Sequence, residues 1–215
     1  RTIVRGIEAT EVIPGRTEAV DEGQPFAVLV DSARTPDALG RLLDGVREAG
    51  AKRLILVIGC EGGRPRAARP YMGEVAHFKA DIVIVTSDNG PEVGTVLNMR
   101  EKYGHDGARP WRGVKRDNWE GGHRFPMIVR WPGMIEAGSV ADQTVCLTDV
   151  MATCAELVGA DLPNDAAEDS VSVLPVILGE TNQEVRDFTL HQTISLALAI
   201  RKGKWKFLDH QGSGG

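Results

Sequence analysis

Cys60 and the basic residues after it form the first pattern in this sequence that could do chemistry. Cys60 follows an apolar run and precedes glycines, and Arg64 and Arg66 come shortly afterwards. Nearby arginines and a following helix start would favour the thiolate, the nucleophilic form of cysteine. The C-x5-R spacing from Cys60 to Arg66 would also suit a loop that cradles phosphate. The alternative interpretation is a glycine-rich loop without a catalytic role.

A second group of candidate residues surrounds Lys115. Histidine titrates near neutral pH and carboxylates exchange protons, so both residue types can act as general acids or bases. The alternative is a solvated loop in which Arg124 pairs with a carboxylate. The candidates in this stretch are His105, Asp106, Glu120 and His123.

The first part of the chain predicts alternating strands and helices. Apolar runs at 26–30, 54–58 and 82–85 lack polar alternation, which is typical of strands covered on both faces. Between them, Thr35-Pro36-Asp37 predicts a helix start, and a second helix is expected over about 70–79. The order is therefore βαβαβ, with parallel pairing and ligands at the carboxyl ends of the strands.

The remainder of the chain predicts a different architecture. Residues 90–122 are polar and rich in glycine and tryptophan, which indicates a long loop. A strand over 127–131 and an amphipathic helix ending at Gly159 follow. Residues 196–201 and 204–208 flank Lys202-Gly203 and predict a hairpin. The second half is expected to be α+β.

Composition narrows the classes of function. The 215 residues have a formal net charge of −5, and their Lys and Arg residues are interspersed with acids, so nucleic acid is not an expected partner. No apolar run reaches the roughly 18 residues of a membrane helix, so no membrane partner is expected. Three cysteines favour neither a disulfide framework nor a structural zinc site. No secretory leader is recognisable, so the expected location is cytoplasmic.

One stretch of the chain resembles the carboxy-terminal domain of Mur ligases. The matching segments are G-R-T-E-A-V-D-E-G-Q-P-F-A-V-L-V-D (15–31), G-C-E-G-G-R (59–64), R-P-Y-M-G-E (69–74) and A-D-I-V-I-V-T-S-D-N (80–89). The family's D-N-P-R substrate motif is Asp88-Asn89-Gly90-Pro91 here, and the phosphate-binding loop G-x-x-x-x-G-K-[ST] is missing. We therefore expect neither ligase activity nor a bound nucleotide.

From about residue 84 onward the chain resembles the later part of a type I sulfatase. The motifs are V-T-S-D-N-G-P (85–91), R-G-V-K-R-D-N-W-E-G-G-H-R-F-P (112–126), I-V-R-W-P-G (128–133), L-T-D-V-M-A-T (147–153) and I-R-K-G-K-W-K-F-L (200–208). Both families end a parallel strand with Thr86-Ser87-Asp88-Asn89. The sequence is thus interpreted as a chimera: a Rossmann-like parallel βαβαβ half (1–89) joined to an α+β sulfatase C-terminal subdomain (90–215).

The sulfatase resemblance also implies roles for individual residues. Asp88 and Asn89 would bind calcium or magnesium, and Lys115 would contact sulfate. The physical chemistry agrees, because carboxylate and amide oxygens are hard donors and lysine is a compact cation. For Asp88 and Asn89 the alternative is a strand-end turn with local side-chain bonds.

The predicted function is hydrolysis of sulfate, phosphate or other activated esters by an incomplete site. The nucleophile motif C/S-x-P-S-R of sulfatases is missing. The partner would be a small anionic ester, and because both halves have lost neighbours we expect a homo-oligomer. The alternatives are a non-catalytic fusion protein that oligomerises, or a new site around Cys60. Candidate residues are Lys115, His123 and Cys60 for catalysis, Lys115 and Arg124 for substrate binding, and Asp88 and Asn89 for metal.

Overall fold

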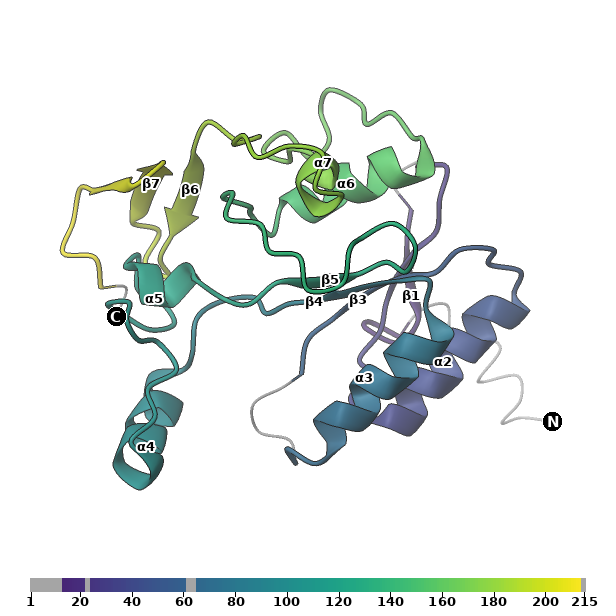
Figure 1. Ribbon diagram of the computed structural model, residues 1–215, viewed down its shortest axis with the longest axis horizontal. Helices are drawn as coiled ribbons and strands as arrows, with labels where there is room; N and C mark the ends of the chain where they lie inside the picture. Colours follow the sequence, from purple (N-terminus) through teal and green to yellow (C-terminus); the bar gives the residue numbers. More distant parts are fainter. Residues whose placement is uncertain (1–12, 22–23, 61–64, 214–215) are drawn as a thin grey trace.

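The computed structural model describes residues 13–21, 24–60 and 65–213 and has a mixed α/β architecture. Its central sheet has three strands in the order β3 (Ile55–Ile58), β4 (Ile82–Val85) and β5 (Ile128–Arg130). β4 pairs in parallel with β3 and antiparallel with β5. In Figure 1 these strands lie in the middle of the molecule, with α2 and α3 on one side and α6 and α7 on the other.

The helix α2 (Pro36–Glu48) begins where the sequence predicts it. The Thr35 side chain accepts a hydrogen bond from the backbone N–H of Ala38 at 3.2 Å, and Pro36 occupies the first turn, where its missing N–H costs no helical hydrogen bond. Leu39 and Leu43 lie one turn apart and are both buried. The helix therefore presents one apolar stripe to the core.

The main hydrophobic core lies between the central strands and the helices α2 and α3 (Ala68–Lys79). The two helices pack against each other, and residues from both contact the strands β3 and β4. Ile82 and Ile84 of β4 are among the most deeply buried side chains, which fits the prediction of a strand covered on both faces. The buried members of this core are Leu39, Leu43, Leu54, Met72, Ala76, Ala80 and Val83.

The predicted βαβαβ order is observed, but its parallel pairing is only partly observed. β2 (Val28–Val30) pairs antiparallel with β1 (Glu18–Val20) in a separate two-stranded sheet, and parallel pairing in the described residues joins only β3 and β4. The carboxylate of Asp31 accepts hydrogen bonds from Thr17 and from the backbone N–H of Ala33. These contacts fix the end of β2 beside β1. Apolar composition predicted a strand here but could not specify its partner.

The prediction of one long loop over residues 90–122 is wrong. The helix α4 (Val93–Tyr103) occupies part of it and ends at Gly104, whose φ of 63° is left-handed. Val96 is the buried residue of this helix, and in Figure 1 the helix extends away from the central sheet. A helix that buries so little carries no apolar stripe, so periodicity could not reveal it. The short helix α5 (Glu120–His123) ends the same stretch.

The C-terminal part combines two helices with an antiparallel sheet, as the sequence predicts. The amphipathic helix α6 (Asp149–Val158) ends at Gly159, and the short helix α7 (Leu174–Ile177) lies beside it. The predicted hairpin is formed by β7 (Leu198–Lys202) and β8 (Trp205–Leu208). A third strand, β6 (Thr189–Gln192), pairs with β7 and was not predicted. None of the helices in the described ranges is long and apolar enough to cross a membrane.

Candidate functional site

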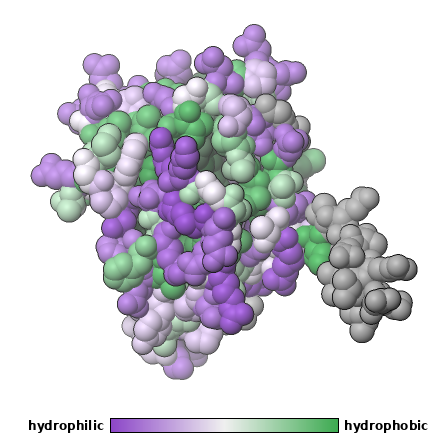
Figure 2. All heavy atoms as spheres, turned by 90° about the vertical axis from the view of Figure 1, so that its right-hand side faces the viewer, coloured by the Kyte–Doolittle hydropathy of each residue, from purple (hydrophilic) through white to green (hydrophobic). Residues whose placement is uncertain are grey.

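A large cleft of about 1550 Å³ lies against the central sheet, α5, α7 and the C-terminal sheet. Its lining includes five of the six predicted site residues. Figure 2 views the molecule from the right-hand side of Figure 1 and shows hydrophobic residues gathered around a hollow. The predicted residues in the lining are Asp88, Asn89, Lys115, His123 and Arg124.

Asp88 and Asn89 follow β4 directly, at the carboxyl end of a strand. Asp88 is exposed and accepts a long hydrogen bond of 3.4 Å from Ser87 Oγ, while Asn89 is half-buried. The next residue, Gly90, is buried and donates its backbone N–H to Gly122 O at 2.8 Å. A Cβ at Gly90 would overlap the carbonyl oxygen of Gly121. This backbone contact places the end of β4 beside α5.

The two adjacent oxygen donors fit a hard cation in chemical type but not in number. Calcium usually takes about six to eight oxygen ligands and magnesium about six. Within the residues that the structure describes, no group of three or more His, Cys, Asp and Glu side chains could hold a metal ion. Asp88 and Asn89 would therefore supply part of a coordination shell, and the rest would have to come from water or from groups outside these residues.

Lys115 lies in the cleft beside an acidic residue. Its backbone N–H donates to Pro91 O at 2.9 Å, and its Nζ lies 3.9 Å from Glu92 Oε2. Arg116 holds the other oxygen of Glu92 at 2.8 Å. Hydrogen bonding to Arg116 is the main cause that lowers the pKa of Glu92. Glu92 is therefore paired more closely with Arg116 than with Lys115.

Glu120 is the centre of an ion-pair network that joins α5 to the C-terminal sheet. Its oxygens accept hydrogen bonds from Arg124 Nε and Lys206 Nζ, each at 2.9 Å, and Arg201 Nε lies 3.9 Å away. Burial alone would raise the pKa of Glu120, but these hydrogen bonds and nearby cations lower it to about 2. Arg124 also stacks on the ring of Trp111 at 3.9 Å. Glu120 is therefore ionised at neutral pH.

His123 is held by a buried asparagine. Its Nε2 lies 3.1 Å from Oδ1 of Asn118, which is fully buried and donates Nδ2 to Ala197 O at 2.9 Å. The His123 ring also lies 4.3 Å from the ring of His191, which lines the same cleft. Burial is the main cause that lowers the pKa of His123 to about 4 and that of His191 to about 3, and the Lys206 cation contributes to both shifts. Both rings are neutral at pH 7.

The remaining candidates lie elsewhere. Cys60 is exposed and is not part of the cleft lining. Arg64 lies outside the described residues, and Arg66 donates a hydrogen bond to Met99 Sδ at 3.2 Å. Asp106 is paired with Arg100 and Arg109, and its pKa is lowered mainly by a hydrogen bond from the backbone N–H of Ala108. It therefore orders the loop after α4.

Four residues around the site were not among the sequence-based candidates: Asn118, His191, Arg201 and Lys206. Arg201 and Lys206 face each other in the register of β7 and β8, and strand alternation puts them on the face opposite to Ile200 and Phe207. The predicted hairpin could therefore have indicated that both basic residues point the same way. No sequence signal indicated that this face meets α5.

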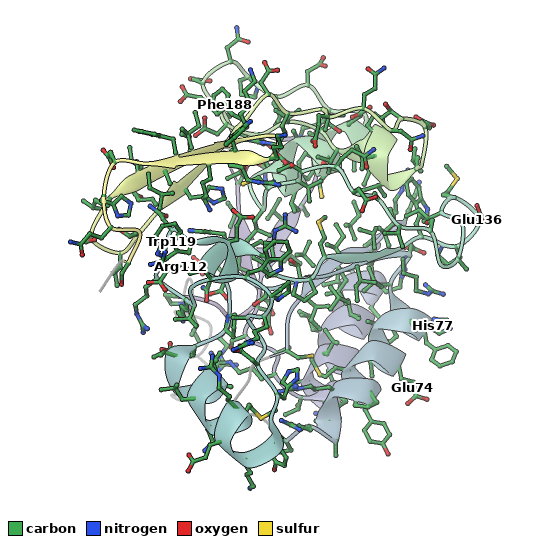
Figure 3. All side chains as sticks on the ribbon, turned by 60° about the vertical axis from the view of Figure 1, so that its left-hand side comes forward. Glu74, His77, Arg112, Trp119, Glu136 and Phe188 are labelled. Atoms are coloured by element: carbon green, nitrogen blue, oxygen red, sulfur yellow. The ribbon has the colours of Figure 1, made fainter. Side chains whose placement is uncertain are left out.

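The contacts that Arg112 and Trp119 make hold the loop before α5. Arg112 stacks on the ring of Trp119 at 4.0 Å, and Figure 3 shows the two side chains together beside α5. Backbone hydrogen bonds also hold this loop, from Asn118 N to Gly212 O and from Gly121 N to Arg112 O. The segment that carries Lys115 and His123 is thus fixed by contacts within itself and by a contact with Gly212, which is distant in sequence.

Two family models each match a part of the chain. The model for the Mur ligase glutamate ligase domain matches residues 15–117, and the sulfatase model matches residues 78–160. The two matches overlap over residues 78–117, which include β4 and α4. The chain therefore joins a segment similar to the C-terminal domain of Mur ligases to a segment similar to sulfatases.

Individual relatives show the same two similarities. The chloroplastic UDP-N-acetylmuramoyl-L-alanyl-D-glutamate–2,6-diaminopimelate ligase MurE homolog of Zea mays is 58% identical over 87 residues, which are 40% of this chain and 11% of that protein. Steryl-sulfatase of Mus musculus is 34% identical over 139 residues, 65% of this chain and 22% of that protein.

A solved structure supports the sulfatase similarity. It is the structure of BT33336S-sulf, from work on glycosaminoglycan metabolism by Bacteroides thetaiotaomicron. It is 29% identical with a TM-score of 0.58, and the match covers 67% of this chain and 33% of that one. The chain thus spans only a minor part of each of these three relatives.

Proposed function

We propose that this chain binds anionic esters, sulfate esters foremost, in the cleft beside β4, and that it contributes the cation- and anion-binding side of a sulfatase-type hydrolase site. The observation that carries the proposal is that Asp88, Asn89 and Lys115 line one cleft. The similarity to sulfatases supports the choice of ester. Phosphate esters remain within the same proposal because their non-bridging oxygens are also anionic.

Each residue would act through its own chemistry. Lys115 would pair with a non-bridging oxygen of the ester as a compact cation. Arg124 lies in the same lining and would offer its guanidinium to an oxyanion group of the substrate. A calcium or magnesium ion held in part by Asp88 and Asn89 would polarise the ester oxygens. Because the pKa of His123 is about 4, this residue would serve at pH 7 as a neutral hydrogen-bonding ring.

The nucleophile of the reaction is not assigned to any residue of this chain. Cys60 remains a candidate from sequence, but its position outside the cleft lining gives no support for attack on an ester bound there. The proposal is therefore first a proposal about binding, and ester hydrolysis is expected to depend on the same residues.

The proposal is tested by sulfate binding and aryl ester turnover. We expect Lys115→Gln to weaken binding of inorganic sulfate by about tenfold, because one charge-assisted contact is lost. We expect Asp88→Ala or a chelator to abolish any turnover of 4-nitrophenyl sulfate or 4-nitrophenyl phosphate. Calorimetry and absorbance at the nitrophenolate band measure the two effects.

Matched controls make this test specific. Lys102→Gln removes an exposed cation from α4, and Asp161→Ala removes an exposed carboxylate after α6, and neither residue lines the cleft. Both control variants should bind sulfate like the unaltered chain. Binding and turnover that are indifferent to Lys115, to Asp88 and to the chelator would rule the proposal out.

A further inference from the structure

Three cations surround the single carboxylate of Glu120. Arg124 and Lys206 donate to its two oxygens, and Arg201 lies 3.9 Å away. The Lys206 and Arg201 side chains are only 10% and 21% exposed. Among the ion pairs of the described residues, these three partly buried cations share one carboxylate, so this network carries excess positive charge.

Two neutral histidines border this network. The pKa values of His123 and His191 are lowered first by burial and then by the Lys206 cation. Neutral rings add no charge of either sign, so the excess is not cancelled from their side. A half-buried positive corner that water solvates poorly is favourable for an anion.

Arg124 and Arg201 have N–H donors that are available to a ligand. Arg124 uses Nε for Glu120, and among the described residues none accepts a hydrogen bond from its terminal nitrogens. Arg201 donates Nη1 to Thr144 Oγ1 at 2.9 Å. Both arginines line the cleft, whereas Lys206 does not. Guanidinium groups match the geometry of sulfate and carboxylate oxygens.

The cleft has room for more than one ester group. Small-molecule sites usually measure roughly 300 to 1,000 Å³, and this cleft measures about 1550 Å³. Its lining extends from Asp88, after β4, to Arg201, on β7. The lining also includes Glu136, which lies on the opposite side of the view in Figure 3 from Trp119.

We propose that Arg124 and Arg201 form a second anion-binding position in the cleft, so that the preferred substrate carries a second oxyanion group besides the ester that Lys115 contacts. This inference rests on the proposed function, because Lys115 is taken as the first position. It defines the substrate class as molecules with two anionic groups, such as a sugar with two sulfates. The second anionic group is a sulfate or a carboxylate, and binding of sugars that carry one or the other distinguishes them.

The test compares two sugars that differ in one anionic group. N-acetylglucosamine 6-sulfate carries one, and N-sulfoglucosamine 6-sulfate carries two. We expect the unaltered chain to bind the disulfated sugar about tenfold more tightly, and Arg201→Gln to remove that preference while leaving the monosulfated sugar unchanged. Glucuronic acid 2-sulfate, which carries a carboxylate as its second anion, identifies which oxyanion is preferred.

Control variants separate the role of Arg201 in binding from a role in folding. Lys204→Gln removes an exposed cation from the turn of the same hairpin, outside the cleft lining, and should keep the preference. Arg124→Gln, at a more exposed side chain, should reduce the preference even if Arg201→Gln does not fold. Thermal unfolding of each variant shows whether it folds.

The outcomes distinguish the two proposals. If both sugars bind equally well in a Lys115-dependent manner, the second position is wrong and the proposed function stands. If neither sugar binds, both proposals fail. If Arg201→Gln and Arg124→Gln both fold and keep the full preference, the second anion is bound elsewhere and the assignment is overturned.

Discussion

His123 and His191 are two half-buried histidines whose rings lie 4.3 Å apart in the cleft. They come from different elements, α5 and β6, so their contact links the Lys115 segment to the C-terminal sheet. The groups that face them are Lys206, Arg201 and Glu120, with Asp117 and Asn118 beside His123. A proton on either ring is unfavourable chiefly because the rings are buried, and the Lys206 cation adds to this effect.

This arrangement predicts that stability falls with acidification. The folded pKa values, about 4 for His123 and about 3 for His191, lie below the usual 6.5, so the unfolded chain binds more protons between those limits. The stability that these neutral rings contribute is fully present above about pH 6.5 and is lost as the pH falls toward 4. From pH 7 to 5 we expect the free energy of unfolding to fall by about 1–3 kcal/mol. This figure allows for solvent screening, because both rings remain partly exposed.

Thermal unfolding of a double variant checks this prediction. His123→Gln with His191→Gln should show a smaller change in Tm between pH 7 and 5 than the unaltered chain. His77→Gln is the control, because His77 is exposed on α3 and points outward in Figure 3. A double variant with the original pH dependence would contradict the proposed cause.

Among the elements, the contact between the end of β4 and α5 is the one that forms the candidate site. It is made by backbone atoms, since Gly90 N–H donates to Gly122 O and a Cβ at Gly90 would overlap Gly121 O. Added Cβ atoms at Gly121 and Gly122 would likewise overlap the carbonyl oxygens of Gly113 and Asp117. These elements can meet this closely only because glycine has no side chain.

Alanine at Gly90 should therefore separate β4 from α5. We expect Gly90→Ala to lower the free energy of unfolding by about 1–3 kcal/mol, the usual cost of overpacking, and to weaken sulfate binding. Gly94→Ala is the matched control, because a Cβ there has no neighbour within 4 Å and the residue lies in α4. It should be neutral or stabilising by about 0.5–1 kcal/mol. Denaturant titration measures the free energy of unfolding of both variants. Equal effects of Gly90→Ala and Gly94→Ala would contradict the role given to the Gly90 contact.

At the scale of the whole molecule, the segment similar to Mur ligases and the segment similar to sulfatases share one sheet. β3 precedes the predicted boundary and β5 follows it, and both pair with β4. The division into domains at 1–89 and 90–215 remains our proposal for the origin of the chain. Homo-oligomer formation also remains a prediction, for sedimentation measurements. Its supporting observation is the exposed row of Leu190, Ile200 and Phe207 across the C-terminal sheet.

The shared sheet predicts that both segments unfold together. All four tryptophans lie between residues 111 and 205, so tryptophan fluorescence reports only on the later part of the chain. Far-ultraviolet circular dichroism reports on helices from both parts. We expect the two signals to give one coincident denaturant transition, because removing either part would expose the buried faces of β4. Two separate midpoints would show that the segments fold independently.

Several parts of the fold could be predicted because their signals are local. Thr35 and Pro36 predict the start of α2, Gly159 predicts the end of α6, and Lys202-Gly203 predicts the β7–β8 turn. The helix α4 could not be predicted, because it buries chiefly Val96 and so has no apolar stripe. The partner of β2 was also unpredictable, because apolar residues favour a strand without specifying its neighbour.

The sequence by itself determined the two family resemblances and the residue types at Asp88, Asn89, Lys115, His123 and Arg124, since motifs and chemistry are read directly from the order of residues. The tertiary structure decided which of these residues share a cleft, and it excluded Cys60 from that lining. It also brought Arg201 and Lys206 to Glu120, residues more than eighty positions away in the chain. Such long-range contacts depend on how the elements pack in space, which no local pattern specifies.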